Sequence, residues 1–195
     1  MAGVTRPTTG ILGGAFDPPH RGHVELARAA RAHYGFDRLL VLVVADPGHK
    51  QTVASAEARL ELAGVAFRGV PGVEVELDRH SRTVDFLEER QPENAVFLVG
   101  SDELAAFTSW KQPARVLELV SLGVAMRPGV PEDELLELSA RLPAPDRISF
   151  FAMQPIPVSS REIRERIRIG EPIDDLVPPA VAEAISRLGL YRGAE

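Results

Sequence analysis

The sequence contains no cysteine among its 195 residues. This absence excludes disulfide bonds, thiolate catalysis and cysteine-ligated zinc, and it is consistent with a reducing compartment. Long hydrophobic runs are also missing, because the longest one, Leu39 to Ala45, is far shorter than the ~20 residues that cross a bilayer. The amino-terminal residues lack a basic segment followed by an apolar core, so no secretory signal is indicated. We therefore expect a cytoplasmic protein that does not partner with a membrane.

An excess of positive charge is lacking as well, since the formal net charge is −6. Proteins that bind nucleic acid are typically basic, so no nucleic-acid partner is expected. A small anionic ligand would then have to be held by a local cluster of donors and cations. Two such clusters lie at opposite ends of the chain, His20 with His23 and the arginine-rich run from 161 to 168.

Apolar residues make up 45% of the chain, which is ordinary for a globular protein, and its length suits one domain over residues 1–195. Strand-like and helix-like segments alternate. Strands are expected at 9–12, 39–45, 73–77, 95–99, 122–126 and 148–151, and helices at 20–33, 55–67, 83–90, within 103–120, at 132–141, 159–169 and 179–188. This alternation predicts an α/β fold, a Rossmann-like doubly wound and mostly parallel sheet, with a carboxy-terminal helical part at about 157–191. Ligands of such sheets bind at the carboxyl ends of the strands.

The most informative segment is Gly-Gly-Ala-Phe-Asp-Pro-Pro-His-Arg-Gly-His, from Gly13 to His23. It places glycines between a strand and a helix, where backbone N–H groups can bind phosphate. His20 and His23 are three residues apart, so the first turn of a helix would present both imidazoles on one face. Taken singly, Gly13-Gly14 reads as a tight turn and the histidines as surface residues. Zinc held by Asp17, His20 and His23 is a further alternative, but it lacks a water-activating glutamate.

The second informative segment is Ser-Ser-Arg-Glu-Ile-Arg, from Ser159 to Arg164. Ser159 and Glu162 predict a capping box and hence a helix start. Arg161 and Arg164 would then lie in the first turn, where the helix dipole disfavours cations. A bound anion would resolve this conflict, and a solvated arginine-rich face is the alternative.

Four further residues allow both a structural and a binding interpretation. Trp110 is the only tryptophan, and it can belong to the core or stack on a flat ligand. Asp102, in the expected bend Gly100-Ser101-Asp102, can cap a helix or accept hydrogen bonds from a ribose. Thr83 is by default a helix cap and Lys50 a solvated lysine.

Together these segments resemble the nucleotidyltransferase superfamily with the His-x-Gly-His signature, and more closely the bacterial nicotinate (nicotinamide) mononucleotide adenylyltransferases. The resemblance covers nearly the whole chain, in order and at compatible spacing. It includes the segments Gly13 to His23, Thr83-Val84-Asp85-Phe86-Leu87, Gly100 and Asp102 with Trp110, Arg127 to Gly129, Ser159 to Arg164, Leu176-Val177-Pro178 and Gly189-Leu190-Tyr191.

The resemblance implies transfer of AMP from ATP to nicotinate or nicotinamide mononucleotide, with Mg²⁺ accompanying ATP and no metal site of the protein's own. It implies that His20, His23 and Arg164 are catalytic. The implied ATP-binding residues are Gly14, Ala15, Phe16, His20, His23, Gly100, Asp102, Ser159, Ser160 and Arg164. The implied mononucleotide-binding residues are Lys50, Thr83 and Trp110. An oligomer is allowed but not specified.

Three residues depart from the family pattern. Ala15 stands where threonine is usual, Pro19 replaces an aliphatic residue, and Lys111 follows the tryptophan where an aromatic or histidine residue is common. The last departure leaves the preference between nicotinate and nicotinamide open. Alternative functions are a sibling transferase that uses phosphopantetheine or CTP, a nucleotide sensor without turnover, and a metal-dependent hydrolase.

Overall fold

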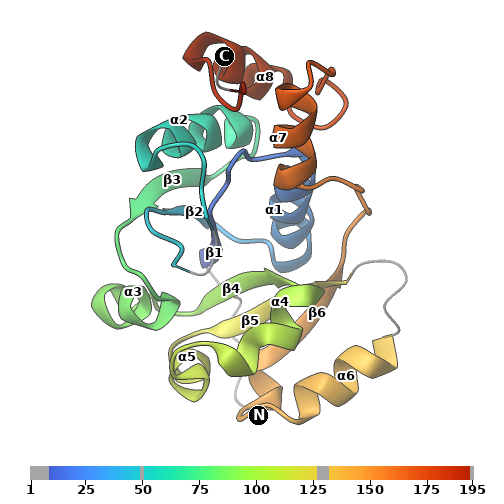
Figure 1. Cartoon of the computed structure of the whole chain (residues 1–195). Coiled ribbons are helices and arrows are strands. Elements are labelled where there is room, and N and C mark those ends of the chain that lie inside the picture. Colours follow the sequence, from blue (N-terminus) through green and yellow to red (C-terminus); the bar gives the residue numbers. More distant parts are fainter. Residues whose placement is uncertain (1–8, 49–50, 127–131, 194–195) are drawn as a thin grey trace.

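The computed structural model describes residues 9–48, 51–126 and 132–193. Their six strands form one sheet in the order β3-β2-β1-β4-β5-β6, with every neighbouring pair parallel (Figure 1). The strands β2 and β3 follow on one side of β1, and β4, β5 and β6 follow on its other side. The order in which strands are added therefore switches sides between β1 and β4, which is the doubly wound arrangement expected from the sequence. The strands are β1 (Thr9–Gly14), β2 (Arg38–Val44), β3 (Val73–Asp78), β4 (Ala95–Gly100), β5 (Ser121–Met126) and β6 (Ile148–Ala152).

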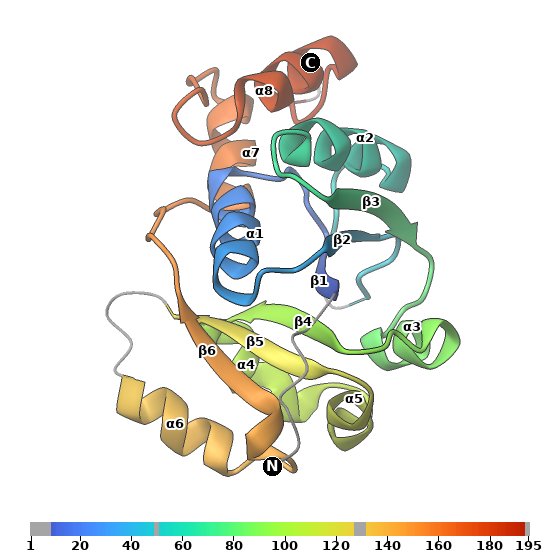
Figure 2. The same ribbon diagram turned by 180° about the vertical axis from the view of Figure 1, so that it is seen from behind.

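Helices cover both faces of the sheet (Figures 1 and 2). Parallel neighbours require a crossover connection, and most of the crossovers here are helical. The helices are α1 (Arg21–Tyr34), α2 (Ala56–Phe67), α3 (Thr83–Arg90), α4 (Ser101–Ala106), α5 (Pro113–Leu119), α6 (Glu132–Ala140), α7 (Ser160–Arg168) and α8 (Pro179–Leu188), with short 3₁₀ turns at Phe107–Ser109 and Pro145–Arg147.

Strand β2 shows why the sheet is buried on both sides. Leu39, Val41 and Val43 belong to one hydrophobic cluster, which includes residues of α1, α2, α7 and α8. Leu40 and Leu42 belong to the other cluster, which includes residues of α3, α4, α5 and α6. Because successive strand residues point to opposite faces, a continuous Leu/Val run fills both clusters. Each buried side chain of this kind stabilises the fold by about 1.5–3 kcal/mol.

Helix boundaries agree closely with the sequence predictions in several places. The helices α3 and α8 begin and end at the expected residues, and the Ser55 side chain caps α2 by accepting a hydrogen bond from the Ala58 N–H. Two local expectations were wrong. The segment Gly100-Ser101-Asp102 is not a bend, because α4 begins directly at Ser101, and the cap of α3 is Arg82 rather than Thr83. Within the described residues, no helix is long and apolar enough to cross a membrane.

Candidate active site

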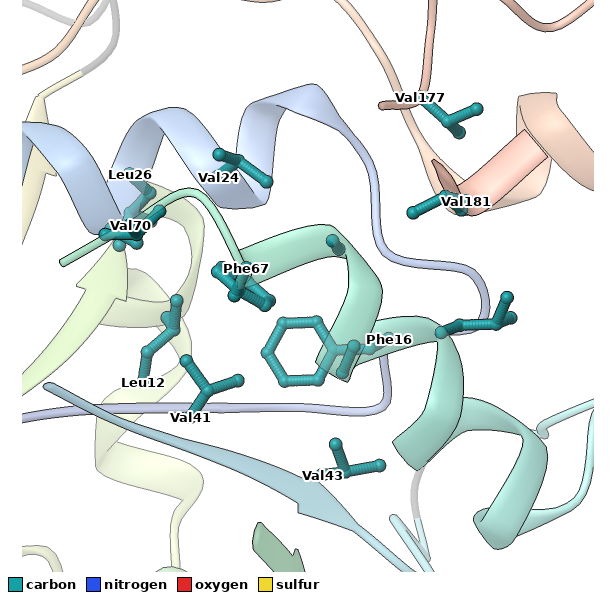
Figure 3. Packing of buried hydrophobic residues seen from close by; sticks show 14 of the residues in the cluster. Leu12, Phe16, Val24, Leu26, Val41, Val43, Phe67, Val70, Val177 and Val181 are labelled. Carbon is teal, nitrogen blue, oxygen red and sulfur yellow. The ribbon is translucent and has the colours of Figure 1, made fainter. Parts of the chain in front are cut away.

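The loop that follows β1 is anchored in the core by Phe16. Its side chain is 2% exposed and meets Phe67 edge-on, with 5.7 Å between ring centroids. Figure 3 shows the Phe16 ring projecting into the cluster beside Phe67. A Cβ atom on Gly14 would lie 3.0 Å from Cζ of Phe16, so the glycine lets the loop turn back over this ring. The loop backbone therefore leaves the sheet on a fixed path toward α1.

The two histidines lie together at the start of α1. His20 is the N-cap residue, and its backbone N–H donates to Nδ1 of His23 at 3.2 Å. The two rings stack with centroids 3.7 Å apart, and the Phe16 ring meets His23 edge-on at 5.0 Å. Because Nδ1 of His23 accepts a hydrogen bond, a neutral His23 carries its proton on Nε2, where it can be donated to another group.

The amino-terminal end of α7 lies against the same loop. The Ser160 hydroxyl donates to the carbonyl of Pro18 at 2.8 Å, and Nη1 of Arg164 donates to the carbonyl of Asp17 at 2.6 Å. These bonds join residues 142 and 147 positions apart in the sequence. The structure thus brings together the two segments, at opposite ends of the sequence, for which anion binding was expected.

The capping box expected at α7 is only half formed. The Ser159 hydroxyl accepts from the Glu162 N–H at 3.1 Å, as predicted. The Glu162 carboxylate instead accepts from Arg166 at 3.0 Å, because that cation lies one turn along the same helix face. The expectation that Arg164 lies in the first turn was wrong, because α7 begins at Ser160 and Arg164 is its fifth residue; its guanidinium instead reaches the carbonyl of Asp17 in the loop.

Asp17 connects the loop to two other parts of the chain. Its side chain is 3% exposed, and its carboxylate accepts from the backbone N–H groups of Val53 at 2.6 Å and Ala54 at 3.2 Å. The hydroxyl of Tyr191 donates to the same carboxylate at 2.7 Å. Burial raises the pKa of the Tyr191 hydroxyl, as does its bond to Asp17, so the phenol stays neutral and donates. These three hydrogen bonds occupy both carboxylate oxygens of Asp17, which makes it a poor ligand for the zinc ion considered from the sequence.

Arg59 on α2 is a buried structural support of the loop that the sequence patterns did not predict. Its side chain is 1% exposed, and its guanidinium donates to four carbonyls, those of Ala15 (2.8 Å), Val44 (2.8 Å), Ala45 (2.7 Å) and Ala54 (3.2 Å). Burial lowers the pKa of Arg59, while the nearby Asp17 carboxylate opposes that shift. A signal existed, because Arg59 shares the helical face of Leu62, Ala63 and Ala66, where a charge is unexpected.

A hollow of about 330 Å³ adjoins Arg164, between α7 and the chain after α8. Four arginines line it, Arg161, Arg164, Arg168 and Arg192, together with a single carboxylate, that of Glu165. Glu165 accepts two hydrogen bonds from Arg168, which neutralises one of the four cations. The hollow beside the loop is therefore lined by more positive than negative charge, in a protein of negative net charge.

The opposite side of the sheet's switch point carries the other site candidates. Asp102 is exposed in the first turn of α4, directly after β4, and Thr83 is the first residue of α3. Trp110 is half-buried and packs against Phe97 and Phe107, with centroids 5.8 and 5.1 Å away. Lys50 and the segment Arg127 to Gly129 lie outside the described residues.

Ion pairs organise the surface around Thr83 and Trp110. Lys111 donates to the Asp85 carboxylate at 2.7 Å, across 26 residues. His80, in the loop before α3, bridges Asp78 at 2.7 Å and Glu89 at 3.1 Å. The hydrogen bond from His80 to Asp78 raises the pKa of the imidazole, with Glu89 adding to the effect.

Comparison with known proteins shows the family to which the chain belongs. The family model for cytidylyltransferase-like proteins matches residues 11–166. Curated relatives named "Probable nicotinate-nucleotide adenylyltransferase" match almost end to end. The protein of Bordetella avium is 36% identical and is matched over 98% of its length by 95% of this chain. That of Thermus thermophilus is 38% identical, over 98% of its length and 94% of this chain.

Solved structures agree with the fold. The nicotinic acid mononucleotide adenylyltransferase of Plasmodium falciparum, in complex with NaAD, superimposes with a TM-score of 0.73 at 16% identity. The superposition covers 94% of this chain and 96% of that protein. By sequence similarity over nearly its whole length, and with the doubly wound fold and paired histidines described above, the chain belongs to the nicotinate-nucleotide adenylyltransferases of the cytidylyltransferase-like family.

Proposed function

We propose that this chain transfers the adenylyl group of ATP to nicotinate mononucleotide, with nicotinamide mononucleotide as the alternative acceptor. The products are deamido-NAD, or NAD, and pyrophosphate, so the reaction is a step of NAD biosynthesis. The observation that carries the proposal is the contact of Ser160 and Arg164 with the loop that leads to His20 and His23. The relatives described above support this choice of reaction because the likeness spans almost the entire chain.

The proposed chemistry is a direct in-line displacement at the α-phosphorus. A phosphate oxygen of the mononucleotide forms a bond to this phosphorus, and the bond to the oxygen that bridges the α- and β-phosphates breaks. Pyrophosphate leaves with that electron pair. The nucleophile is already an anion, so the protein's contribution is positioning and stabilisation of the charge on the phosphates.

The ATP side of the proposal rests on donors around the loop. The backbone of Gly14, Ala15 and Phe16 and the imidazoles of His20 and His23 would contact the phosphates. Ser160 and Arg164, in a helix start capped by Ser159, would hold the outer phosphates that leave. The arginines of the neighbouring hollow reinforce the field on that side. Asp102, after Gly100, would bind a ribose.

The acceptor side of the proposal rests on an aromatic ring and two polar residues. Trp110 would stack on the pyridine ring, since its indole is half-buried and braced by Phe97 and Phe107. Thr83 would line that pocket. Lys50 would approach the mononucleotide phosphate, a role for which its sequence position is the only support.

A magnesium ion fits this site as a companion of ATP. Magnesium prefers oxygen ligands and retains several waters, so the triphosphate can supply its ligands. The Asp17 carboxylate is occupied by three hydrogen bonds, which makes it a poor ligand. When bound, the ion would neutralise part of the phosphate charge.

The proposal is tested by measuring pyrophosphate release from ATP with nicotinate mononucleotide, nicotinamide mononucleotide or phosphopantetheine as acceptor, and from CTP with the same acceptors. We expect release from ATP with a pyridine mononucleotide. Faster release with phosphopantetheine or from CTP would favour a sibling transferase. Tight ATP binding without release in any combination would favour a nucleotide sensor.

A further inference from the structure

Tyr191 takes part in the loop's hydrogen bonding although it lies 174 residues from its partner, Asp17. Its ring is 8% exposed, in the cluster that also holds Phe16. It lies three residues beyond the end of α8, where Gly189 reverses the chain and the Leu190 N–H returns to the carbonyl of Ile185 at 3.1 Å. The carboxy-terminal segment is thereby aimed back at the loop after β1.

The backbone of Tyr191 supports a role beyond filling space. Its φ angle is 63°, in the left-handed region that large side chains rarely adopt. Phe16, which directly precedes Asp17 in the chain, also has a positive φ angle, 50°. Unfavourable backbone conformations of this kind persist where surrounding contacts enforce them, and they concentrate at functional sites. Tyr191 is hydrogen-bonded to the Asp17 carboxylate, and Phe16 is the residue before Asp17.

The bonds to Asp17 and Pro18 show how Tyr191 can act at a distance. Arg164 donates to the carbonyl of Asp17, and Ser160 donates to the carbonyl of Pro18. Both proposed phosphate-holding side chains therefore depend on the orientation of the same two residues. The Tyr191 hydroxyl fixes the Asp17 side chain from one direction, while Val53 and Ala54 fix it from another.

We propose that Tyr191 is a positioning residue for ATP. The hydrogen bond from its hydroxyl to Asp17 keeps Arg164 and Ser160 in the orientation that binds the outer phosphates. This inference rests on the proposed function for its kinetic consequence. Tyr191 itself touches no reacting atom in this scheme. Its effect passes through Asp17, whose negative charge also lies beside Arg59 and Arg164.

Charge balance favours a specific effect on phosphate binding. The Arg164 guanidinium uses Nη1 for the Asp17 carbonyl and lies 3.9 Å from the Asp17 carboxylate. Without the Tyr191 hydroxyl, the carboxylate loses one of three donors and is free to turn toward Arg164. A closer ion pair between Asp17 and Arg164 would compete with phosphate for the same cation. Affinity for the outer phosphates should fall more than affinity for the mononucleotide.

The experiment compares Tyr191→Phe with Tyr34→Phe. The two variants are matched, because each removes one hydroxyl that makes a 2.7 Å hydrogen bond, and Tyr34 bonds Ser149 between the far end of α1 and β6. The measurements are the melting temperature, KM and kcat with ATP and nicotinate mononucleotide, and pyrophosphate affinity by calorimetry. We expect Tyr191→Phe to raise KM for ATP and weaken pyrophosphate binding by about tenfold, which corresponds to 1.4 kcal/mol. KM for the mononucleotide should change less than twofold, and Tyr34→Phe should leave all these constants unchanged.

A second arm tests whether the effect passes through Asp17. In an Asp17→Asn background, Tyr191→Phe should weaken pyrophosphate binding by much less than tenfold, because the two residues act as a unit. Equal pyrophosphate affinity in Tyr191→Phe, Tyr34→Phe and the unmodified chain would overturn the inference and leave Tyr191 a purely structural residue. Pyrophosphate binding needs no turnover. An unchanged pyrophosphate affinity in Tyr191→Phe can therefore be distinguished from a failure of the proposed function. The latter would show as absent pyrophosphate release in the unmodified chain.

Discussion

The loop between β1 and α1 and the surface around Trp110 lie at the same edge of the sheet but are held in different ways. The loop is fixed by buried or part-buried hydrogen bonds from residues distant in sequence, namely Arg59, Ser160, Arg164 and Tyr191. The surface around Trp110 is fixed by exposed ion pairs such as Lys111 with Asp85. Buried bonds to a carboxylate or from a guanidinium are strong and directional, whereas exposed pairs contribute about 0–1 kcal/mol.

This difference suits the two proposed tasks. Stabilising charge on transferring phosphates requires donors that are in place before reaction, which a rigid loop provides. Binding of the acceptor nucleotide, by contrast, is compatible with a surface around Trp110 that can adjust its shape. Substitutions in the loop region should therefore change kcat, the affinity for ATP or the stability of the whole fold, and substitution of Trp110 should change the affinity for the acceptor without changing that for ATP.

The largest effect is expected for His23→Ala, which removes the imidazole that the structure stacks on His20. We expect kcat to fall by about 10²–10³, by analogy with the loss of one oxyanion-hole donor, while the fold survives. Steady-state pyrophosphate release measures this. The matched control is His33→Ala, in the last turn of the same helix, which should retain full activity. Turnover of His23→Ala within twofold of the unmodified chain would contradict the role of His23.

Arg59→Met sharpens the comparison from the side of stability. Four carbonyls, all at least partly buried, would lose a donor, so we expect the free energy of unfolding to fall by about 3 kcal/mol. The melting temperature should fall by on the order of 10 °C. Arg68→Met, at the exposed carboxyl end of the same helix, is the control and should shift it by less than about 2 °C. Equal melting temperatures for the two variants would show that the Arg59 bonds are dispensable.

Trp110→Ala tests the adjustable side. Loss of ring stacking should raise KM for the mononucleotide by about tenfold, since stacking of this kind is worth about 1–3 kcal/mol. KM for ATP should stay within twofold, because the Trp110 ring packs on Phe97 and Phe107, which are not loop residues. Trp110→Phe keeps a smaller ring, so its KM for the mononucleotide should lie between those of the unmodified chain and Trp110→Ala. A parallel rise in both KM values would break the separation between the two regions.

The smallest effect is expected for His80→Gln. The raised pKa of His80 means that the folded chain binds the proton more tightly than the unfolded chain does. The stability from the charged bridge to Asp78 and Glu89 is therefore complete below the ordinary value of 6.5 and is lost as pH rises through the raised pKa. The melting-temperature difference between the unmodified chain and His80→Gln should shrink across that window. A difference independent of pH would show that His80 is not charged in the bridge.

Much of the frame follows from local sequence patterns. Helical spacing is enough to place His20 and His23 on one face, and the Leu/Val run is enough to identify β2 as a buried strand. Local patterns fail at Gly100, which reads as a bend although its extended backbone (φ −82°, ψ 167°) lets α4 begin at once. Glycine permits both conformations, so its presence cannot decide between them.

The supports of the loop could not be predicted in the same way. Asp17 accepts hydrogen bonds from residues 36, 37 and 174 positions away, and such pairs leave no periodic trace in one sequence. Arg59 was detectable in principle, as a charge on an apolar helix face. Tyr191 carried only its place in a Gly-Leu-Tyr ending, which says nothing of its partner.

The hydrogen bonds that join Asp17 to Arg164 and Tyr191 also tie formation of the proposed phosphate site to the folding of almost the whole chain. Closing so long a segment of chain is entropically unfavourable, so this corner cannot persist in a partly folded molecule. A ligand that binds only the finished corner stabilises the entire native state by mass action rather than one subregion. If nucleotide binds this corner as proposed, nucleotide in solution should therefore raise the stability of the whole chain.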